Sequence, residues 1–133
     1  LEKYSKQLDI EANALYNMVS SQVLPAAYRF QKNLASSVRE VSGLVPEDEI
    51  MPQRELLSRT ISLVSGIQVD VVTLKSGFES ARCIEDEQLK AEAYCGSVKV
   101  KMEELRKKVD ELEAIMDDDL WPLPKYWEML FLY

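Results

Sequence analysis

The stretch YSKQLDIEANALYNMVSSQVLPAAYRFQKNLASSVREV, residues 4–41, decides the fold class of this chain. Its apolar residues recur every three or four positions, which is the period of one face of an α-helix. They are Leu8, Ala12, Leu15, Val19, Val23, Ala26, Phe30, Leu34, Val38 and Val41. We therefore predict one long helix that stops at Gly43 and is kinked at Pro25, where proline removes a backbone donor.

Two further apolar series have the same helical period. The loop between the first helix and the second is predicted at GLVPEDEIMP, residues 43–52, with Pro52 starting the second helix. Gly66 and Gly77 interrupt that helix, and they either loosen it or allow a close helix crossing. The acidic run at residues 85–87 marks the start of the third helix, which Pro122 and Pro124 end. The two series are Leu57, Ile61, Val64, Ile67, Val71, Leu74, Phe78, Ala81 and Leu89, Ala93, Val98, Met102, Leu105, Val109, Leu112, Met116.

Three long amphipathic helices with short connections predict an all-α fold, an antiparallel up-down-up bundle. The segment KYWEMLFLY, residues 125–133, is predicted to add a short C-terminal helix. A chain of 133 residues buries one core, so we expect a single helical-bundle domain over residues 1–133. Because the chain starts without Met inside an apparent helix, we expect it to be cut from a longer protein.

The charge balance disfavours anionic partners. Lys and Arg number 16 against 23 Asp and Glu, a formal net charge of -7, so nucleic acid and anionic membrane surfaces would be repelled. No stretch reaches the roughly 18 apolar residues of a membrane span. Cys83 and Cys95 are expected to be buried or half-buried free thiols, which fits a cytoplasmic protein.

The residues also argue against an active site. Histidine is absent, and the four glycines are isolated, so neither the commonest general base nor a phosphate-binding loop is present. Carboxylate pairs such as Glu11 with Glu40, or Glu113 with Asp117, are what charged helix faces produce by default. The run at residues 117–119 is interpreted as a solvated helix end, with a cation site as the alternative. We therefore assign no catalytic, cofactor-binding or metal residue.

Two segments resemble the C-terminal helical region of type III glutamine synthetases. Residues 3–35 carry an I-E-A segment at Ile10 and an L-P-A-A step at Leu24, and residues 102–133 carry the rest of the resemblance. There the pattern M-x-x-L-R-x-x-V-D-E-L-E begins at Met102, and L-W-P-x-P-x-Y begins at Leu120. Residues 44–95 are generic amphipathic helix without a family motif.

The resemblance implies a parent ligase that joins ammonia to glutamate, using ATP and Mg or Mn, in glutamine biosynthesis and nitrogen metabolism. It also implies a homo-dodecamer of two stacked hexameric rings. The family's ATP, glutamate, ammonia and metal sites lie upstream of this region, so no cofactor is expected here. This chain is then a non-catalytic packing and assembly surface, with the catalytic domain and neighbouring subunits as its partners.

The apolar C-terminus is the predicted docking segment. Exposed to water, the run LWPLPKYWEMLFLY at residues 120–133 would be an aggregation site, so we expect protein to cover it. Its neighbour could be these helices, the catalytic domain or an adjacent subunit. The predicted docking residues are Trp121, Pro122, Pro124, Tyr126, Trp127, Leu130 and Phe131.

A second hypothesis belongs to another class of protein. Helical bundles of this period and acidity also act as stand-alone sensors or adaptors, which bind a small ligand or a partner helix between their helices. Specific binding by the isolated chain would favour this alternative.

Overall fold

The computed structural model describes residues 1–124, and their secondary structure is helical without a strand. The first long rod comprises α1 (Glu2–Met18), a π turn (Val19–Val23) and α2 (Leu24–Val41). The second rod is α3 (Glu47–Arg82), and the third comprises α4 (Glu87–Ala93), a π turn (Tyr94–Val98) and α5 (Lys99–Ile115). The predicted all-α class and its three long helices are therefore confirmed. The predicted C-terminal helix lies outside the described residues.

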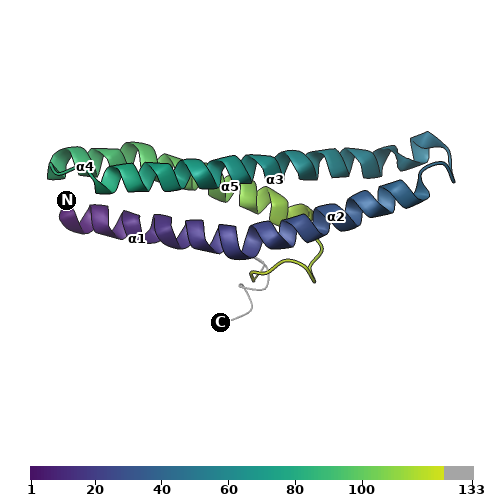
Figure 1. Ribbon diagram of the computed structural model, residues 1–133, viewed down its shortest axis with the longest axis horizontal. Helices are drawn as coiled ribbons and strands as arrows, with labels where there is room; N and C mark the ends of the chain where they lie inside the picture. The colour runs from purple at the N-terminus through teal and green to yellow at the C-terminus, as the bar shows by residue number, and fades with distance from the viewer. Residues whose placement is uncertain (125–133) are drawn as a thin grey trace.

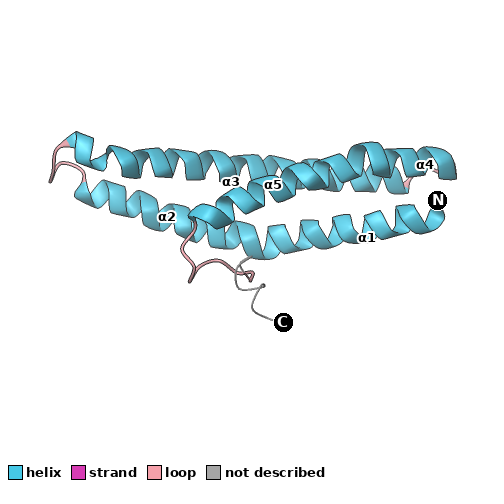
Figure 2. Cartoon of the chain, turned by 180° about the vertical axis from the view of Figure 1, so that it is seen from behind, coloured by secondary structure: helices cyan, strands magenta, loops and turns pink. Residues whose placement is uncertain are grey.

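The helix α3 is the central element of the packing. It contacts α1, α2 and α5, whereas α2 packs mainly against α3. Figures 1 and 2 show the three rods extended along the long axis of the molecule, with α5 stopping well before the far end of the α2–α3 pair. One part of the molecule is thus three helices thick, and its other end is two helices thick.

In the first rod, a π turn lies just before Pro25. The N–H of Leu24 donates to the carbonyl of Val19, five residues back, and Pro25 then stands in the first turn of α2. A proline at this position has no N–H to lose from the helical ladder, so it is tolerated there. The break predicted at Pro25 therefore takes the form of one widened turn just before the proline, and Val19 and Val23 remain buried through it.

The first connection is shorter than predicted. The rod stops at Val41, and Gly43 adopts φ +85°, in the left-handed region that favours glycine. The prediction that Pro52 starts the next helix is wrong, because α3 begins at Glu47 and Pro52 lies inside it. The carboxylates at residues 47–49 lie in the first turn, where the positive end of the helix dipole stabilises them.

The end of the third rod also differs from the prediction. The break at residues 83–86 is confirmed, and Asp86 caps α4 by accepting a hydrogen bond from the Gln88 N–H. However, α5 ends at Ile115, so Pro122 and Pro124 do not terminate it. Asp117 instead forms a turn, because its carbonyl accepts from the N–H groups of Leu120 and Trp121. This turn redirects the chain toward the helices.

The core follows the predicted apolar stripes, with two local corrections. Ile61 and Leu89 were expected to be buried, but both are exposed; Thr60 is buried instead, and its hydroxyl donates to the Leu56 carbonyl at 2.8 Å. Ala91 and Tyr94 likewise take the buried places near Leu89. The largest fully buried members of the main core are Phe78, Ile67, Leu74, Leu105, Leu112 and Tyr94. In addition, Cys83 and Cys95 are both exposed free thiols, so the expectation that they are buried or half-buried is wrong.

The two glycines of α3 lie at its contact with α5. A Cβ added at Gly66 would meet the Lys108 side chain at 3.5 Å, and one at Gly77 would meet Lys101 at 3.3 Å. Lys108 continues past Gly66 to pair with Asp70, with 2.7 Å between Nζ and Oδ2. The atoms nearest to both added Cβ positions belong to flexible lysine stems and not to the α5 backbone, so this contact does not favour the close-crossing interpretation.

Candidate functional site

The carboxylate pairs considered from the sequence do not form a catalytic centre. Glu11 and Glu40 lie on one continuous rod, so at about 1.5 Å per residue they are roughly 40 Å apart. Glu113 lies within α5, whereas Asp117 lies beyond its end and accepts a hydrogen bond from the Asp119 N–H at 2.9 Å. Within residues 1–124, no group of three or more Asp, Glu, Cys or His side chains is placed to hold a metal ion.

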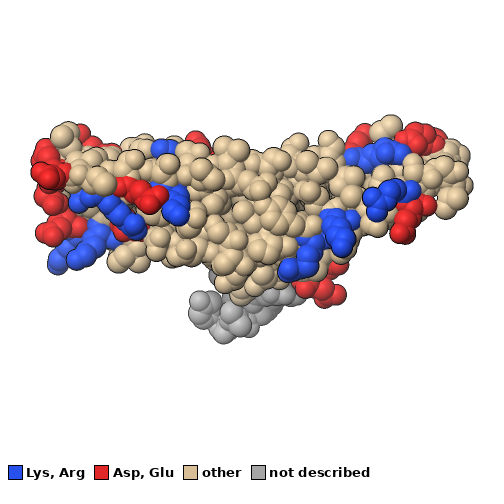
Figure 3. All heavy atoms as spheres, viewed as in Figure 1, with Lys and Arg blue, Asp and Glu red and all other residues tan. Residues whose placement is uncertain are grey.

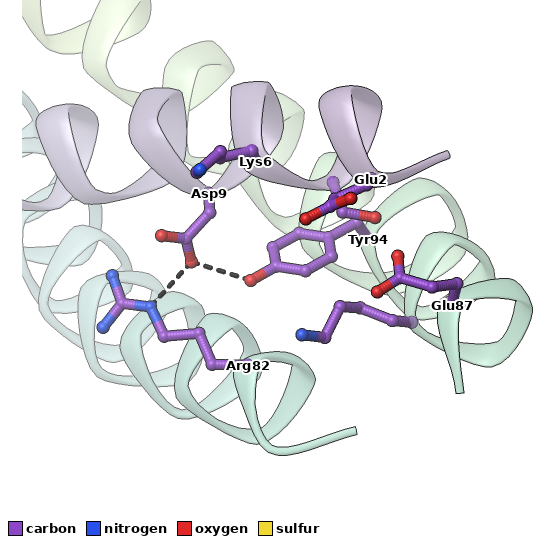
Figure 4. Close-up of a pocket in the computed structure, with 8 residues that line it drawn as sticks. Glu2, Lys6, Asp9, Arg82, Glu87 and Tyr94 are labelled. Atoms are coloured by element: carbon purple, nitrogen blue, oxygen red, sulfur yellow. Dashed lines mark hydrogen bonds and ion pairs between the residues drawn. The ribbon is translucent and has the colours of Figure 1, made fainter. Parts of the chain in front are cut away.

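A polar cluster joins the three rods near the N-terminus. Asp9 of α1 accepts two hydrogen bonds on the same oxygen, Oδ1, from Arg82 Nε of α3 and from the Tyr94 hydroxyl, each at 2.7 Å (Figure 4). The Arg82 guanidinium also lies over the Phe78 ring, 4.7 Å from its centroid. Arg82 is therefore held from two sides, and Asp9 connects all three rods.

The charges of this cluster reinforce one another. Partial burial opposes ionisation of Asp9, but the hydrogen bonds from Arg82 and Tyr94 outweigh it, and the pKa of this carboxyl is lowered. Lys90 contributes in the same direction through its positive charge. Burial, together with the bond to Asp9, raises the pKa of the Tyr94 hydroxyl. At neutral pH the cluster thus consists of a carboxylate, a guanidinium and a neutral phenol.

The second π turn brings Tyr94 to this cluster. Tyr94 opens the turn, and the N–H of Lys99 donates back to its carbonyl, five residues away. The ring is buried while its hydroxyl reaches Asp9. Asp9 and Arg82 were not among the residues predicted from the sequence. The available signal was that Asp9 directly follows Leu8, on the edge of the apolar stripe.

A pocket of about 190 Å³ opens beside the cluster. Its wall also contains Ser5, which is only 4% exposed and whose Oγ has no hydrogen-bond partner among the described residues. Acidic and basic side chains share the remainder of the wall. They are Glu2, Lys6, Glu87 and Lys90.

The described part of the docking segment lies against this chain's own helices. Trp121 is 7% exposed and belongs to the main core, with Leu120 and Leu123 packed against that core from the outside. Pro122 and Pro124 are exposed. The other predicted docking residues lie outside the described residues; they are Tyr126, Trp127, Leu130 and Phe131.

Trp121 closes one side of a groove between α1 and α5. Leu15 and Met18 of α1 face Val109 of α5 across this groove, whose volume is about 480 Å³. The indole Nε1 is buried without a partner among the described residues, so the contact is apolar in character. Three neighbours were possible for the start of the docking segment, and in the structure Trp121 packs against this chain's own helices α1 and α5.

The fold and the sequence together define the class of this chain. Residues 1–42 match the family described as the glutamine synthetase C-terminal domain, which is consistent with the all-helical structure. More particularly, the chain is a relative of the type-3 glutamine synthetases, and the resemblance is confirmed over nearly its whole length.

Three relatives illustrate this similarity. The type-3 glutamine synthetase of Dictyostelium discoideum is 36% identical, across 98% of this chain and 18% of its own length. A glutamine synthetase of Bacteroides fragilis (strain YCH46) is 32% identical with the same coverage. A glutamine synthetase of Butyrivibrio fibrisolvens is 25% identical, across 98% of this chain and 19% of its own length. The chain thus spans less than a fifth of the relatives that it matches.

Among residues 1–124, no helix has both the length and the apolar character that crossing a bilayer requires.

Proposed function

We propose that this chain is the non-catalytic C-terminal helical domain of a type-3 glutamine synthetase and provides a surface for packing and assembly. In this proposal the rods form an antiparallel up-down-up bundle as a single domain over residues 1–133. The rest of the enzyme supplies the ATP and Mg or Mn sites and the ligation of ammonia to glutamate. The catalytic domain and neighbouring subunits of a homo-dodecamer are its partners.

An uncharged middle region is the observation that carries the packing role. Residues 12–28 of the first rod and 60–69 of α3 contain no Asp, Glu, Lys or Arg, in a chain whose net charge is -7. Figure 3 shows charged side chains gathered toward the two ends of one face, with the middle of that face free of them. Depletion of charge is the compositional mark of the centre of a protein–protein interface.

Exposed apolar side chains lie in and beside this uncharged region. Val69 and Val72 of α3 are 63% and 67% exposed, and Ile61, earlier in the same helix, is also exposed. Val69 and Val72 also line a shallow depression with Ser65, Gln68 and Thr73. Full burial of an aliphatic side chain contributes about 1.5–3 kcal/mol, so covering a few of them would hold a large partner domain in place.

The absence of catalysis is tested with the isolated 133-residue chain. The chain is mixed with glutamate, ammonia, ATP and Mg²⁺ or Mn²⁺, and glutamine and phosphate are measured. We expect no product above the level without protein. Glutamine formed in proportion to the amount of this chain would overturn the non-catalytic assignment.

The packing role is tested in a full-length enzyme that ends in this sequence. A double substitution, Val69→Arg with Val72→Arg, would force two charges into the covered surface and should shift sedimentation toward smaller species, or lower the thermal stability of the assembly. Val100→Arg, at a comparably aliphatic and exposed position on α5, is the control. If the double variant and the control assemble equally well, the surface around Val69 is not an interface.

A further inference from the structure

We propose that the pocket beside Asp9, Arg82 and Tyr94 binds a small zwitterion, an α-amino acid carrying one carboxylate and one ammonium group. This inference goes beyond the packing role and does not depend on it, because the pocket lies at the α1–α4 end of the helices and can be studied in the isolated chain. Figure 4 shows the labelled side chains around it.

The charges around the pocket are separated into two ends. In Figure 4, Lys6, Asp9 and Arg82 lie at the hydroxyl end of Tyr94, and Glu2 and Glu87 lie toward the other end of its ring. Lys90, whose charge acts on Asp9, adds to the basic end. Asp9 is already neutralised by Arg82, so one end of the pocket has excess positive charge and the other has excess negative charge.

Several of these charged groups can form further hydrogen bonds or ion pairs. Among the described residues, neither Lys6 nor Lys90 forms an ion pair, and the same is true of Glu2 and Glu87. A carboxylate bound by lysine ammonium groups, and an ammonium bound by glutamates, would form charge-assisted hydrogen bonds at both ends. A simple anion or a simple cation would engage only one end.

Ser5 provides an independent sign of an absent polar partner. Its side chain is more than nine-tenths buried in the wall of the pocket, yet its Oγ makes no hydrogen bond within residues 1–124. Buried polar atoms normally have a partner, since leaving one unpaired costs about 1–3 kcal/mol. The Oγ itself exposes less than 1 Å² of surface, so a ligand oxygen or nitrogen would become its partner once neighbouring side chains move aside.

The geometry is also fixed in advance. Arg82 is held by Asp9 and by the Phe78 ring, and Tyr94 is held by Asp9, so this part of the pocket wall changes little when a ligand enters. A pre-formed site loses less conformational entropy on binding. The volume of about 190 Å³ has room for a small ligand such as an amino acid.

The test is isothermal titration calorimetry on the 133-residue chain. The probes are glycine and L-glutamine as zwitterions, acetate as the carboxylate alone and methylamine as the ammonium alone. We expect both zwitterions to bind and each half-ligand to bind at least about tenfold more weakly, because charge-assisted bonds at one end are missing. Absence of binding by both zwitterions, or equal binding of all four probes, would overturn the proposal.

Paired variants assign the two ends of the ligand. Lys90→Gln should weaken zwitterion and acetate binding about tenfold without changing methylamine binding, and Glu87→Gln should do the reverse for the two half-ligands. Ser5→Ala should weaken the zwitterion. Lys99→Gln, an exposed lysine outside the pocket wall, is the matched control. Equal losses in Lys90→Gln and Lys99→Gln would show that net charge, and not the pocket, governs binding.

Discussion

Replacing Trp121 with alanine tests whether the end of the described chain is part of the helical core. Trp121 lies beyond α5 and is 7% exposed, so nearly all of its side chain is removed from water by the groove between α1 and α5. A large aromatic side chain buries about 150–250 Å². At about 25 cal/mol per Å², this burial stabilises the folded protein by about 4–6 kcal/mol, as an upper estimate.

One polar group reduces this gain. The indole Nε1 is buried without a partner among residues 1–124, and such an orphaned donor costs about 1–3 kcal/mol. The difference predicts that Trp121→Ala lowers the free energy of unfolding by about 1–5 kcal/mol. Trp121→Phe keeps most of the apolar area and removes the orphaned N–H, so we expect a loss of no more than about 1 kcal/mol.

Urea unfolding of the 133-residue chain, followed by far-ultraviolet circular dichroism, measures both variants. Leu44→Ala is the control, because Leu44 is 77% exposed and its truncation should stay within about 0.5 kcal/mol of the unsubstituted chain. If Trp121→Ala unfolds at the same urea concentration as Leu44→Ala, Trp121 does not belong to the core, and the packing described for residues 120–123 is refuted.

Four further predictions concern the polar cluster and the glycines. Because the folded pKa of Asp9 is lowered, its ion pair is fully stabilising above about pH 4 and is lost as the pH falls through that lowered pKa. The urea midpoint should therefore fall less between neutral and acidic pH in Asp9→Asn than in the unsubstituted chain. Tyr94→Phe should lower the free energy of unfolding by about 1–3 kcal/mol in urea titrations at neutral pH, since it removes a hydrogen bond to a carboxylate. Gly66→Ala should raise the thermal midpoint, by about 0.5–1 kcal/mol in stability, because its Cβ meets only the flexible Lys108 stem. Gly43→Ala should lower the midpoint, by about 1 kcal/mol, because its φ is +85°.

The helices could be predicted because their signals are local. A stripe with a period of three to four residues indicates a helix without knowledge of its neighbours, and this held for all three rods. Gly43 and the acidic residues at 85–87 also marked real boundaries, since a left-handed residue and an N-terminal capping turn depend on the nearby chain alone.

The boundaries at proline were predicted less well. Pro52 does not start α3, because three acidic residues and Pro46 before them already favour a helix start at Glu47. Pro122 does not end α5, because the Asp117 turn ends it first. Proline excludes certain hydrogen bonds, but it does not determine which earlier residue stops a helix.

The polar cluster could not be predicted from spacing. Its members are separated by 73 and 85 positions in the sequence, so only the packing of the rods brings them together. The π turn at Tyr94 also sets the direction of that side chain, and no residue pattern before it indicates such a turn. The docking segment was predicted from composition and stays a prediction, whereas the contact of Trp121 with α1 and α5 required the structure.

Because the rods differ in length, the two ends of the molecule are held together by different numbers of helix–helix contacts. Among residues 1–124, the parts of α2 and α3 beyond the end of α5 pack only against each other, and their buried residues Val38 and Ile50 lie outside the main core. Separating this hairpin breaks one helix–helix contact and leaves the three-helix portion intact, so its amide hydrogens should exchange with solvent first. The two-helix end can therefore adapt its shape to a partner surface, whereas the three-helix end keeps its shape.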